Sequence, residues 1–199
     1  MRRLLIPLLL IACSPTPKKA EEQGDAKALM KTALRYDAAG RYEDAAEWYR
    51  KAAEQGLSEA QNNLGVMYKD GQGVAQDEGE AVRWFLLAAR QGNVLAQSNL
   101  GWMYQSGRGV AQNYDSARYW YHEAALKGHA AAQNNLGRML RDGLGTEADT
   151  DSARYWIEKA ALQGLPQARR NLERLGVSPS PPGCGRQQQS RPARRPAGG

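Results

Sequence analysis

The sequence predicts an all-α fold, an α-solenoid of stacked helix-turn-helix repeats that forms a right-handed superhelix. The first observation is a recurring hexapeptide: AQNNLG at 60–65 returns as AQSNLG at 96–101 and as AQNNLG at 132–137, a step of 36 residues each time (60 to 96 and 96 to 132). The second is a pair of apolar stripes with helical spacing in every unit. A fixed period of this length indicates stacked units, because no single unit can bury its own apolar face.

Each unit contains two amphipathic helices in this interpretation. The stripe of the first helix is formed in one unit by Ala60, Leu64, Met67 and Tyr68, at i, i+4, i+7 and i+8. The stripe of the second helix recurs with the same period, as Ala81, Trp84, Phe85 and Ala88, then Ala117, Trp120, Tyr121 and Ala124, then Ala153, Trp156, Ile157 and Ala160. Small and large residues alternate within these stripes, which favours tight packing between neighbouring helices.

The signals that begin and end the helices also repeat. Asp77, Asn113 and Asp149 occupy one repeat position, and their side chains can cap the free N–H groups of the second helix. Asp77 and Glu80 have the spacing of a capping box. The glycine pairs at 71–73, 107–109 and 143–145 follow the first helix, so we interpret the first glycine as a left-handed helix cap. A phosphate-binding loop is disfavoured, because no strand precedes these glycines and no G-K-[ST] follows them.

These motifs together resemble the Sel-1-like repeat, a relative of the tetratricopeptide repeat. The shared pattern is A-x-x-x-L-G-x-x-Y-x-x-G-x-G-V, then an acidic residue, then A-x-x-W-[FY]-x-x-A-A-x-x-G. The matching units are residues 57–92, 93–128 and 129–164. The second has Asn113 in place of the acidic residue, and the third has Leu140 and Thr146 at the Tyr and Val positions. Residues 25–56 resemble a plain tetratricopeptide unit with a shorter turn. Residues 165–176 are expected to form one capping helix, in which Glu173 replaces the glycine.

The first residues resemble the signal of a bacterial lipoprotein. A basic Met1-Arg2-Arg3 precedes an apolar run, and the sequence then reads LIAC, with Cys13 as the residue expected to carry the lipid. Residues 1–12 are then a signal peptide and residues 13–24 a tether. The run is shorter than the roughly 20 residues of a transmembrane helix. A cleaved peptide without lipid and a misplaced start codon remain as alternatives. The resemblance implies a lipid-anchored protein that faces the periplasm, with the outer membrane favoured by Ser14.

Residues 177–199 differ in composition from the repeats. They are rich in proline, glycine and glutamine and contain almost nothing to bury, so we expect a disordered tail. The chain has a formal net charge of +6, and the four arginines of this tail together with Arg2 and Arg3 account for all of it. A nucleic-acid partner is therefore not expected, because it would need clustered cations on the folded surface.

The residues that usually carry catalysis are sparse. Cys13 and Cys184 are the two cysteines, and the second lies alone in the tail. The two histidines, His122 and His129, have no second ligand at metal spacing. No arrangement of serine, histidine and aspartate indicates a catalytic triad. We therefore expect no enzyme activity, no cofactor and no metal.

The remaining candidate site is the groove along the first helices, which line the concave side in tetratricopeptide-like stacks. Opposite the buried stripe, nine residues share one face and form the predicted partner-binding strip: Asn62, Val66, Lys69, Ser98, Trp102, Gln105, Asn134, Arg138 and Arg141. Amides can pair with the backbone of an extended peptide, and arginines can pair with carboxylates. Trp102 is predicted to be an exposed binding residue. The alternative is that it packs against the neighbouring first helix.

Two classes of function remain open from the sequence. The first is a non-catalytic adaptor in the cell envelope that binds another protein or a peptide segment. The second is an envelope enzyme or a regulatory subunit of a cell-wall-active or β-lactam-interacting system. The cysteine pairs of cysteine-rich members of the resembled family, some of which are linked to β-lactam binding, are missing here. Their absence favours the adaptor.

Overall fold

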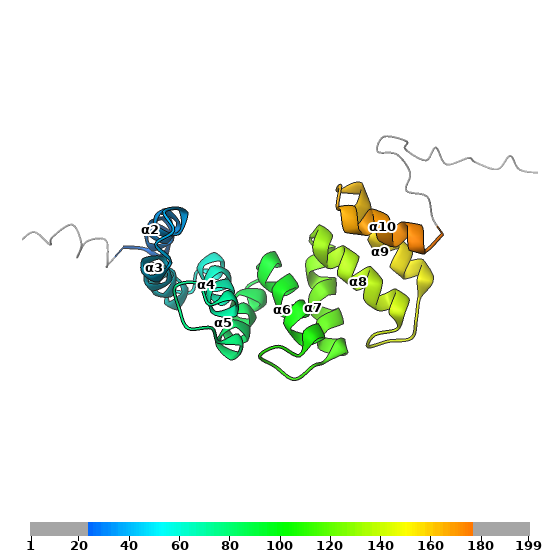
Figure 1. The fold of residues 1–199 in the computed structure, drawn as a ribbon, viewed down its shortest axis with the longest axis horizontal. Coiled ribbons are helices and arrows are strands. Elements are labelled where there is room, and N and C mark those ends of the chain that lie inside the picture. The colour runs from blue at the N-terminus through cyan, green and yellow to red at the C-terminus, as the bar shows by residue number, and fades with distance from the viewer. Residues whose placement is uncertain (1–23, 177–199) are drawn as a thin grey trace, which may run out of the picture.

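The computed structural model describes residues 24–176, which form nine α-helices and no strand. The predicted signal peptide, the tether up to residue 23, and the tail at 177–199 lie outside the described residues. The helices stack in chain order into a curved solenoid that runs from α2 at one end to α10 at the other (Figure 1). The four predicted helix pairs of residues 25–164 and the predicted capping helix at 165–176, nine helices together, are confirmed. Their bounds are α2 Ala26–Ala38, α3 Tyr42–Glu54, α4 Ser58–Asp70, α5 Glu78–Arg90, α6 Val94–Ser106, α7 Tyr114–Leu126, α8 Ala130–Asp142, α9 Thr150–Leu162 and α10 Pro166–Arg174.

The core lies between the first and second helix of each pair and between successive pairs. The first helices are α4, α6 and α8, with α2 at one end and α10 at the other. Both predicted stripes are buried, except that Tyr68 and Trp120 remain partly exposed. A glycine near the middle of each full first helix allows the second helix to come close. A Cβ atom on Gly101 would lie 2.8 Å from Cδ1 of Tyr121, and one on Gly137 would lie 2.5 Å from Cγ1 of Ile157. At Glu173 in α10 no second helix follows within the described residues, so a larger side chain fits.

The predicted side-chain caps of the second helices form, but the predicted capping box does not. The side chains of Asp77, Asn113 and Asp149 each accept a hydrogen bond from the backbone of the first turn. The capping box at Asp77 is wrong, however. The backbone N–H of Asp77 donates to the carbonyl of Tyr68 at 2.9 Å, and the Glu80 carboxylate pairs with Arg83 instead. The end of the preceding helix thus satisfies the donor that a capping box would have satisfied.

The two glycines of each loop have different roles. Gly71, Gly107 and Gly143 adopt a left-handed backbone and cap their helices, as predicted. The second glycine contacts the preceding repeat. A Cβ atom on Gly73 would lie 2.2 Å from the carbonyl of Tyr42, and one on Gly109 would lie 2.2 Å from the carbonyl of Glu78, and these are the first residues of α3 and α5. The second glycine therefore joins adjacent repeats, because only a residue without a side chain fits there.

A ladder of glutamine side chains also joins the repeats, with one interruption. Gln91 donates to the side-chain oxygen of Gln61 at 2.7 Å, and Gln163 donates to that of Gln133 at 2.8 Å. The position between them is Lys127, whose Nζ instead donates to the carbonyl of Gly92 at 2.9 Å. As a result, the buried Oε1 of Gln97 has no hydrogen-bond partner among the described residues.

Lys127→Gln should repair this interruption and stabilise the fold. The new amide would occupy the place from which Gln91 and Gln163 donate, and we expect the free energy of unfolding to rise by about 1 kcal/mol, the usual contribution of an intramolecular hydrogen bond. Chemical denaturation of both proteins measures the difference. Lys127→Ala is the control, since it removes the bond to Gly92 without supplying an amide. Equal stability of the two variants would contradict the prediction.

Candidate functional site

The predicted strip divides into exposed and buried members. Its exposed or partly exposed members lie at equivalent positions of three neighbouring first helices, α4, α6 and α8, and they are Val66, Lys69, Trp102, Gln105, Arg138 and Arg141. They therefore run along one face of the stack. At its C-terminal end this face borders a pocket between the first helices α8 and α10, and Arg138 and Arg141 of the strip help to line it.

The three small polar members of the strip were predicted to face the groove, and the structure buries them. Asn62, Ser98 and Asn134 are all less than a tenth exposed. The side chain of Asn62 accepts a hydrogen bond from Asn99 at 3.1 Å, and that of Asn134 accepts one from Asn171 at 2.8 Å. These bonds join adjacent first helices. The amides are thus used between repeats and are not free for a peptide backbone, which corrects the prediction for these positions.

Trp102 differs from the tryptophans of the core. Its side chain is 36% exposed, whereas Trp48, Trp84 and Trp156 are at most 9% exposed. The Nζ atom of Lys69 lies 6.0 Å from the centre of its ring, and the Cζ atom of Arg108 lies 5.0 Å from it. A cation over an aromatic face is favourable by about 0.5–1 kcal/mol at an exposed site. The ring is therefore held in place by two cations while part of it remains open to solvent. Trp120, which was predicted to be a core residue, is only partly buried.

A hydrogen bond from Tyr121 of α7 orients the side chain of Gln105, which follows Trp102 by three residues on α6. The hydroxyl of Tyr121 donates to the side-chain oxygen of Gln105 at 3.0 Å. Tyr121 is fully buried, and this burial raises the pKa of its hydroxyl well above the ordinary value. The hydroxyl consequently stays protonated and keeps donating. With its oxygen occupied in this way, the Gln105 amide can present its N–H groups to a ligand.

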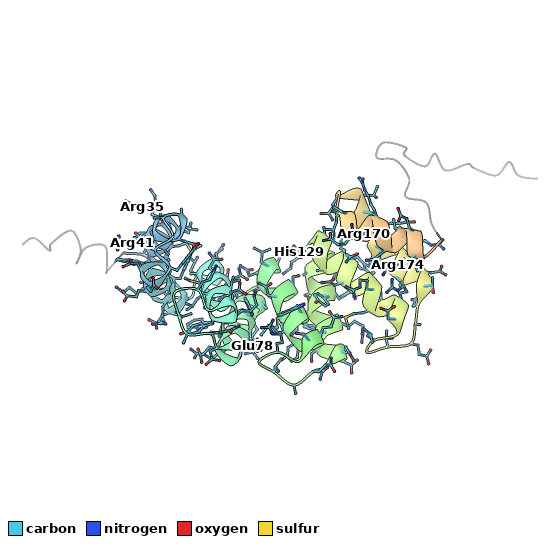
Figure 2. The ribbon with its side chains drawn as sticks, viewed as in Figure 1. Arg35, Arg41, Glu78, His129, Arg170 and Arg174 are labelled. Atoms are coloured by element: carbon cyan, nitrogen blue, oxygen red, sulfur yellow. The ribbon has the colours of Figure 1, made fainter. Side chains whose placement is uncertain are left out.

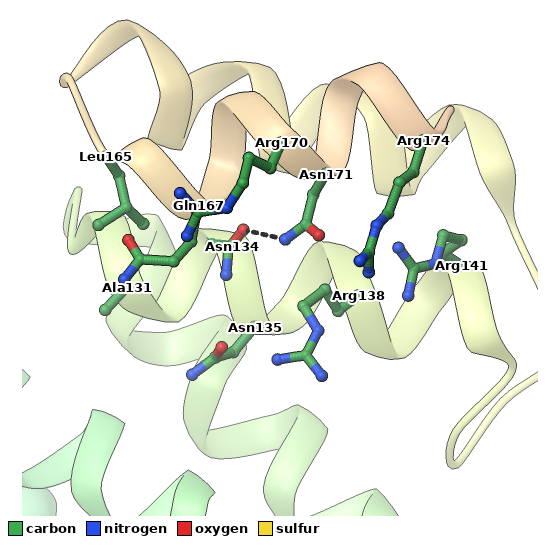
Figure 3. Close-up of a pocket in the computed structure, with 10 residues that line it drawn as sticks. All are labelled: Ala131, Asn134, Asn135, Arg138, Arg141, Leu165, Gln167, Arg170, Asn171 and Arg174. Carbon is green, nitrogen blue, oxygen red and sulfur yellow. Dashed lines mark hydrogen bonds between the residues drawn. The ribbon is translucent and has the colours of Figure 1, made fainter. Parts of the chain in front are cut away.

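The C-terminal end of the strip is strongly cationic. Arg138 and Arg141 on α8 face Arg170 and Arg174 on α10 across a pocket of about 400 Å³. Arg170 and Arg174 lie at the C-terminal end of the arc (Figure 2). The guanidinium groups of Arg138, Arg141 and Arg174 gather at one end of the pocket (Figure 3). We did not predict the two arginines of α10, although the period contains the signal, because Arg174 follows Arg138 by one repeat of 36 residues.

The four arginines of the pocket differ in whether a carboxylate pairs with them. Arg141 pairs with Asp142, with Nε of the arginine 2.7 Å from one carboxylate oxygen. The hydrogen bond from Arg141 lowers the pKa of Asp142. Within residues 24–176, Arg138, Arg170 and Arg174 have no carboxylate within ion-pair distance. The pocket therefore carries a net positive charge.

Both histidines have contacts that support the fold: one caps a helix and the other packs against a tryptophan. The side chain of His129 caps α8, because its Nδ1 accepts from the N–H of Ala132 at 3.3 Å. Burial lowers its pKa, which favours the neutral form that can accept. His122 packs edge-on against Trp156, with ring centres 5.9 Å apart. Among the described residues, no three His, Cys, Asp or Glu side chains are grouped so that they could hold a metal ion.

The predicted lipid anchor is not tested by these helices. The expected lipidation residue, Cys13, lies outside the described residues. In the part of the chain that the structure describes, no helix combines the length and the apolar character that a membrane span needs.

Comparison with known proteins gives the same picture of the repeats. The model of the Sel1 repeat matches residues 41–57, 58–93, 94–129 and 130–165. The first of these matches covers only the second helix of the N-terminal pair. No curated protein matches the sequence.

Two solved structures are similar over most of this chain. One is a protective antigen present in uropathogenic Escherichia coli strains, which displays an SLR fold. It is 39% identical with a TM-score of 0.75, and the match covers 80% of this chain and 36% of that one. The other is a Sel1 repeat protein from Oxalobacter formigenes, 32% identical with a TM-score of 0.69, matched over 77% of this chain and 63% of its own. The chain thus spans less than two thirds of the length of either protein.

Proposed function

The chain belongs to the Sel1 repeat family, whose members are generally protein-interaction scaffolds, and from this premise we propose that it is a non-catalytic adaptor of the bacterial cell envelope. In this proposal it binds a partner protein, or an extended segment of one, along the face of its first helices. The six open strip residues, from Val66 on α4 to Arg141 on α8, form the binding surface.

The observation that carries this proposal is Trp102. A large aromatic ring that is partly exposed in the middle of a concave face, and already oriented by neighbouring side chains, is typical of residues that dominate the energy of an interface. The cations beside it and the amide of Gln105 surround the ring with hydrogen-bond donors. Lys69 is already paired with Asp70, and Arg108 with Glu78. A partner that covers the ring would therefore bury apolar surface and accept hydrogen bonds from the Gln105 amide and from the N–H groups that these two cations have left.

Trp102→Ala should weaken partner binding by about 2 kcal/mol or more, the range of a hot-spot residue. Stability should fall by less than the roughly 3–5 kcal/mol of a core tryptophan, because a third of this side chain is already in solvent. The partner is first captured from envelope extracts with a photo-crosslinking amino acid at Val66. Binding titrations and thermal melts of the wild-type and variant proteins then separate the two effects.

Tyr155→Ala is the matched control for this substitution. Tyr155 is also an exposed aromatic residue, 52% exposed, but it lies on a second helix. The substitution Tyr155→Ala should leave the affinity for the partner unchanged. A large loss of melting temperature with unaltered affinity for Trp102→Ala would instead place that ring in the core and remove it from the binding surface.

The proposed location rests on the first residues of the sequence. A basic start, an apolar run and the LIAC box support a lipid on Cys13. Several acyl chains would give stable attachment, where one chain is marginal. The repeats would then be tethered close to the membrane surface.

Cys13→Ser should release the protein from membranes in cells and leave the repeats folded. We expect the variant to move from the membrane fraction to the soluble fraction, with an unchanged circular dichroism spectrum. Mass spectrometry of the wild-type protein should show the added acyl chains on a chain that starts at Cys13. An intact chain that keeps its first twelve residues and carries no acyl mass would contradict the anchor.

A further inference from the structure

The pocket between α8 and α10 has the features of a ligand site. It has a volume of about 400 Å³, and its lining comes from two first helices that lie side by side. The hydrogen bond from Asn171 to Asn134, at 2.8 Å, fixes the two helices to each other across the pocket (Figure 3). The walls are thus set by a direct contact between repeats.

The charge of this pocket indicates an anion. Four arginines line it, no carboxylate lines it, and only Arg141 has an ion-pair partner among the residues at 24–176. Like charges held together without counter-charges are unfavourable, and a bound anion would reverse that cost. The planar guanidinium group presents paired N–H donors that match the two oxygens of a carboxylate.

The remaining lining residues favour a peptide over a small anion. Asn135 and Gln167 bring side-chain amides to the same pocket, and Leu165 and Ala131 add apolar surface. Amides can pair with both the N–H and the C=O groups of an extended backbone, which a bare phosphate does not offer. The pocket also continues the strip that ends at Arg138 and Arg141 on α8.

We propose that this pocket binds an acidic segment of a partner protein, with its Asp or Glu carboxylates held by Arg138, Arg170 and Arg174. The inference rests on the proposed function, since the pocket is the C-terminal end of the same first-helix face. The chain's own residues 177–199 do not supply this ligand. They carry four arginines and no acidic side chain, so the pocket would repel them.

A fluorescein-labelled, glutamate-rich peptide tests the proposal in fluorescence anisotropy titrations with the full chain. Its glutamine counterpart of the same length is the peptide control. We expect the glutamate peptide to bind and the glutamine peptide not to bind. Affinity should fall with added salt, because the partly exposed charges are screened.

Variants of the protein then locate the binding. Arg138→Gln combined with Arg174→Gln should weaken the glutamate peptide by at least about tenfold, since hydrogen bonds to charged groups are the strong ones. Arg170→Gln alone should weaken it as well, and this residue is exposed, so folding is not at risk. Arg154→Gln removes one exposed arginine from a second helix and should have no effect. Melting curves check that each variant is folded.

Three outcomes would overturn the proposal: equal affinity in the pocket variants and Arg154→Gln, equal binding of the two peptides, or tighter binding of inorganic phosphate or anionic vesicles than of the peptide. These outcomes are distinct from failure of the proposed function. Crosslinking at Val66 that persists while the arginine variants have no effect would leave the adaptor function standing and remove only the acidic ligand. Failure of the Val66 crosslinker to capture any partner while all four pocket arginines are intact would remove the function itself.

Discussion

Gly109→Ala is expected to lower the free energy of unfolding by roughly 2–6 kcal/mol, which combines the cost of a strained backbone with that of overpacking. The φ angle of Gly109 is +66°, a region that residues with a side chain rarely adopt. In addition, the new Cβ atom would lie 2.2 Å from the carbonyl oxygen of Glu78 at the start of α5. That neighbour is backbone and cannot rotate away. The contact between two repeats would have to open.

Gly128→Ala is the control that separates the two costs. Gly128 has a φ of +87°, but a Cβ atom there would meet nothing within 4 Å. It should therefore show only the backbone strain, about 1–3 kcal/mol. Urea unfolding followed by circular dichroism measures both variants against the wild-type protein. Equal losses in the two variants would show that the approach of Gly109 to α5 contributes nothing.

Leu100→Ala should destabilise the chain by about 2–5 kcal/mol, as buried leucine truncations do. Leu100 has no exposed surface and lies in the cluster that contains Phe85 and Met103. In a solenoid each repeat contacts only its neighbours, so stability is close to a sum over repeats and interfaces. A defect in the central repeat should therefore weaken the coupling between the N-terminal and C-terminal halves.

Leu172→Ala provides the comparison at the end of the stack. Leu172 is also buried, but it lies on α10, which packs on one side only within the described residues. Hydrogen exchange should increase in α9 and α10 for this variant, and on both sides of α6 for Leu100→Ala. If hydrogen exchange instead increased equally in all helices in both variants, the described repeats would unfold as one unit, which would contradict this prediction.

The cationic surroundings of Trp102 connect the fold to the proposed binding surface. Arg108 contacts the ring and also pairs with Glu78 of the preceding repeat. Arg108 directly precedes Gly109, which packs on the same residue. The interface between these repeats thus positions a side chain of the candidate site. Variants of Gly109 are therefore expected to disturb binding as well as stability.

How far the sequence predicts the site can be judged from individual positions. Trp102 was identified by its place opposite the buried stripe, and its partial exposure agrees with that place. The same reasoning was wrong for Asn62, because the position opposite the stripe on one helix faces the next first helix. Arg170 illustrates the same effect in reverse. It occupies the repeat position of Asn62 and Asn134 but is exposed, since no further first helix covers α10 within the described residues.

The sequence alone was enough to predict the repeats, the nine helices of residues 24–176, the N-terminal caps of α5, α7 and α9, the glycine caps of α4, α6 and α8, and most of the core. It could do so because the 36-residue period, the helical spacing of apolar residues and the capping side chains act locally or between immediate neighbours. The packed structure was needed to show which polar side chains are buried between repeats, why the second loop glycine is needed, and that four arginines meet in one pocket. These features depend on the distance and angle between stacked pairs. That geometry results from packing between residues about one repeat apart, and a helical pattern within one segment does not contain it.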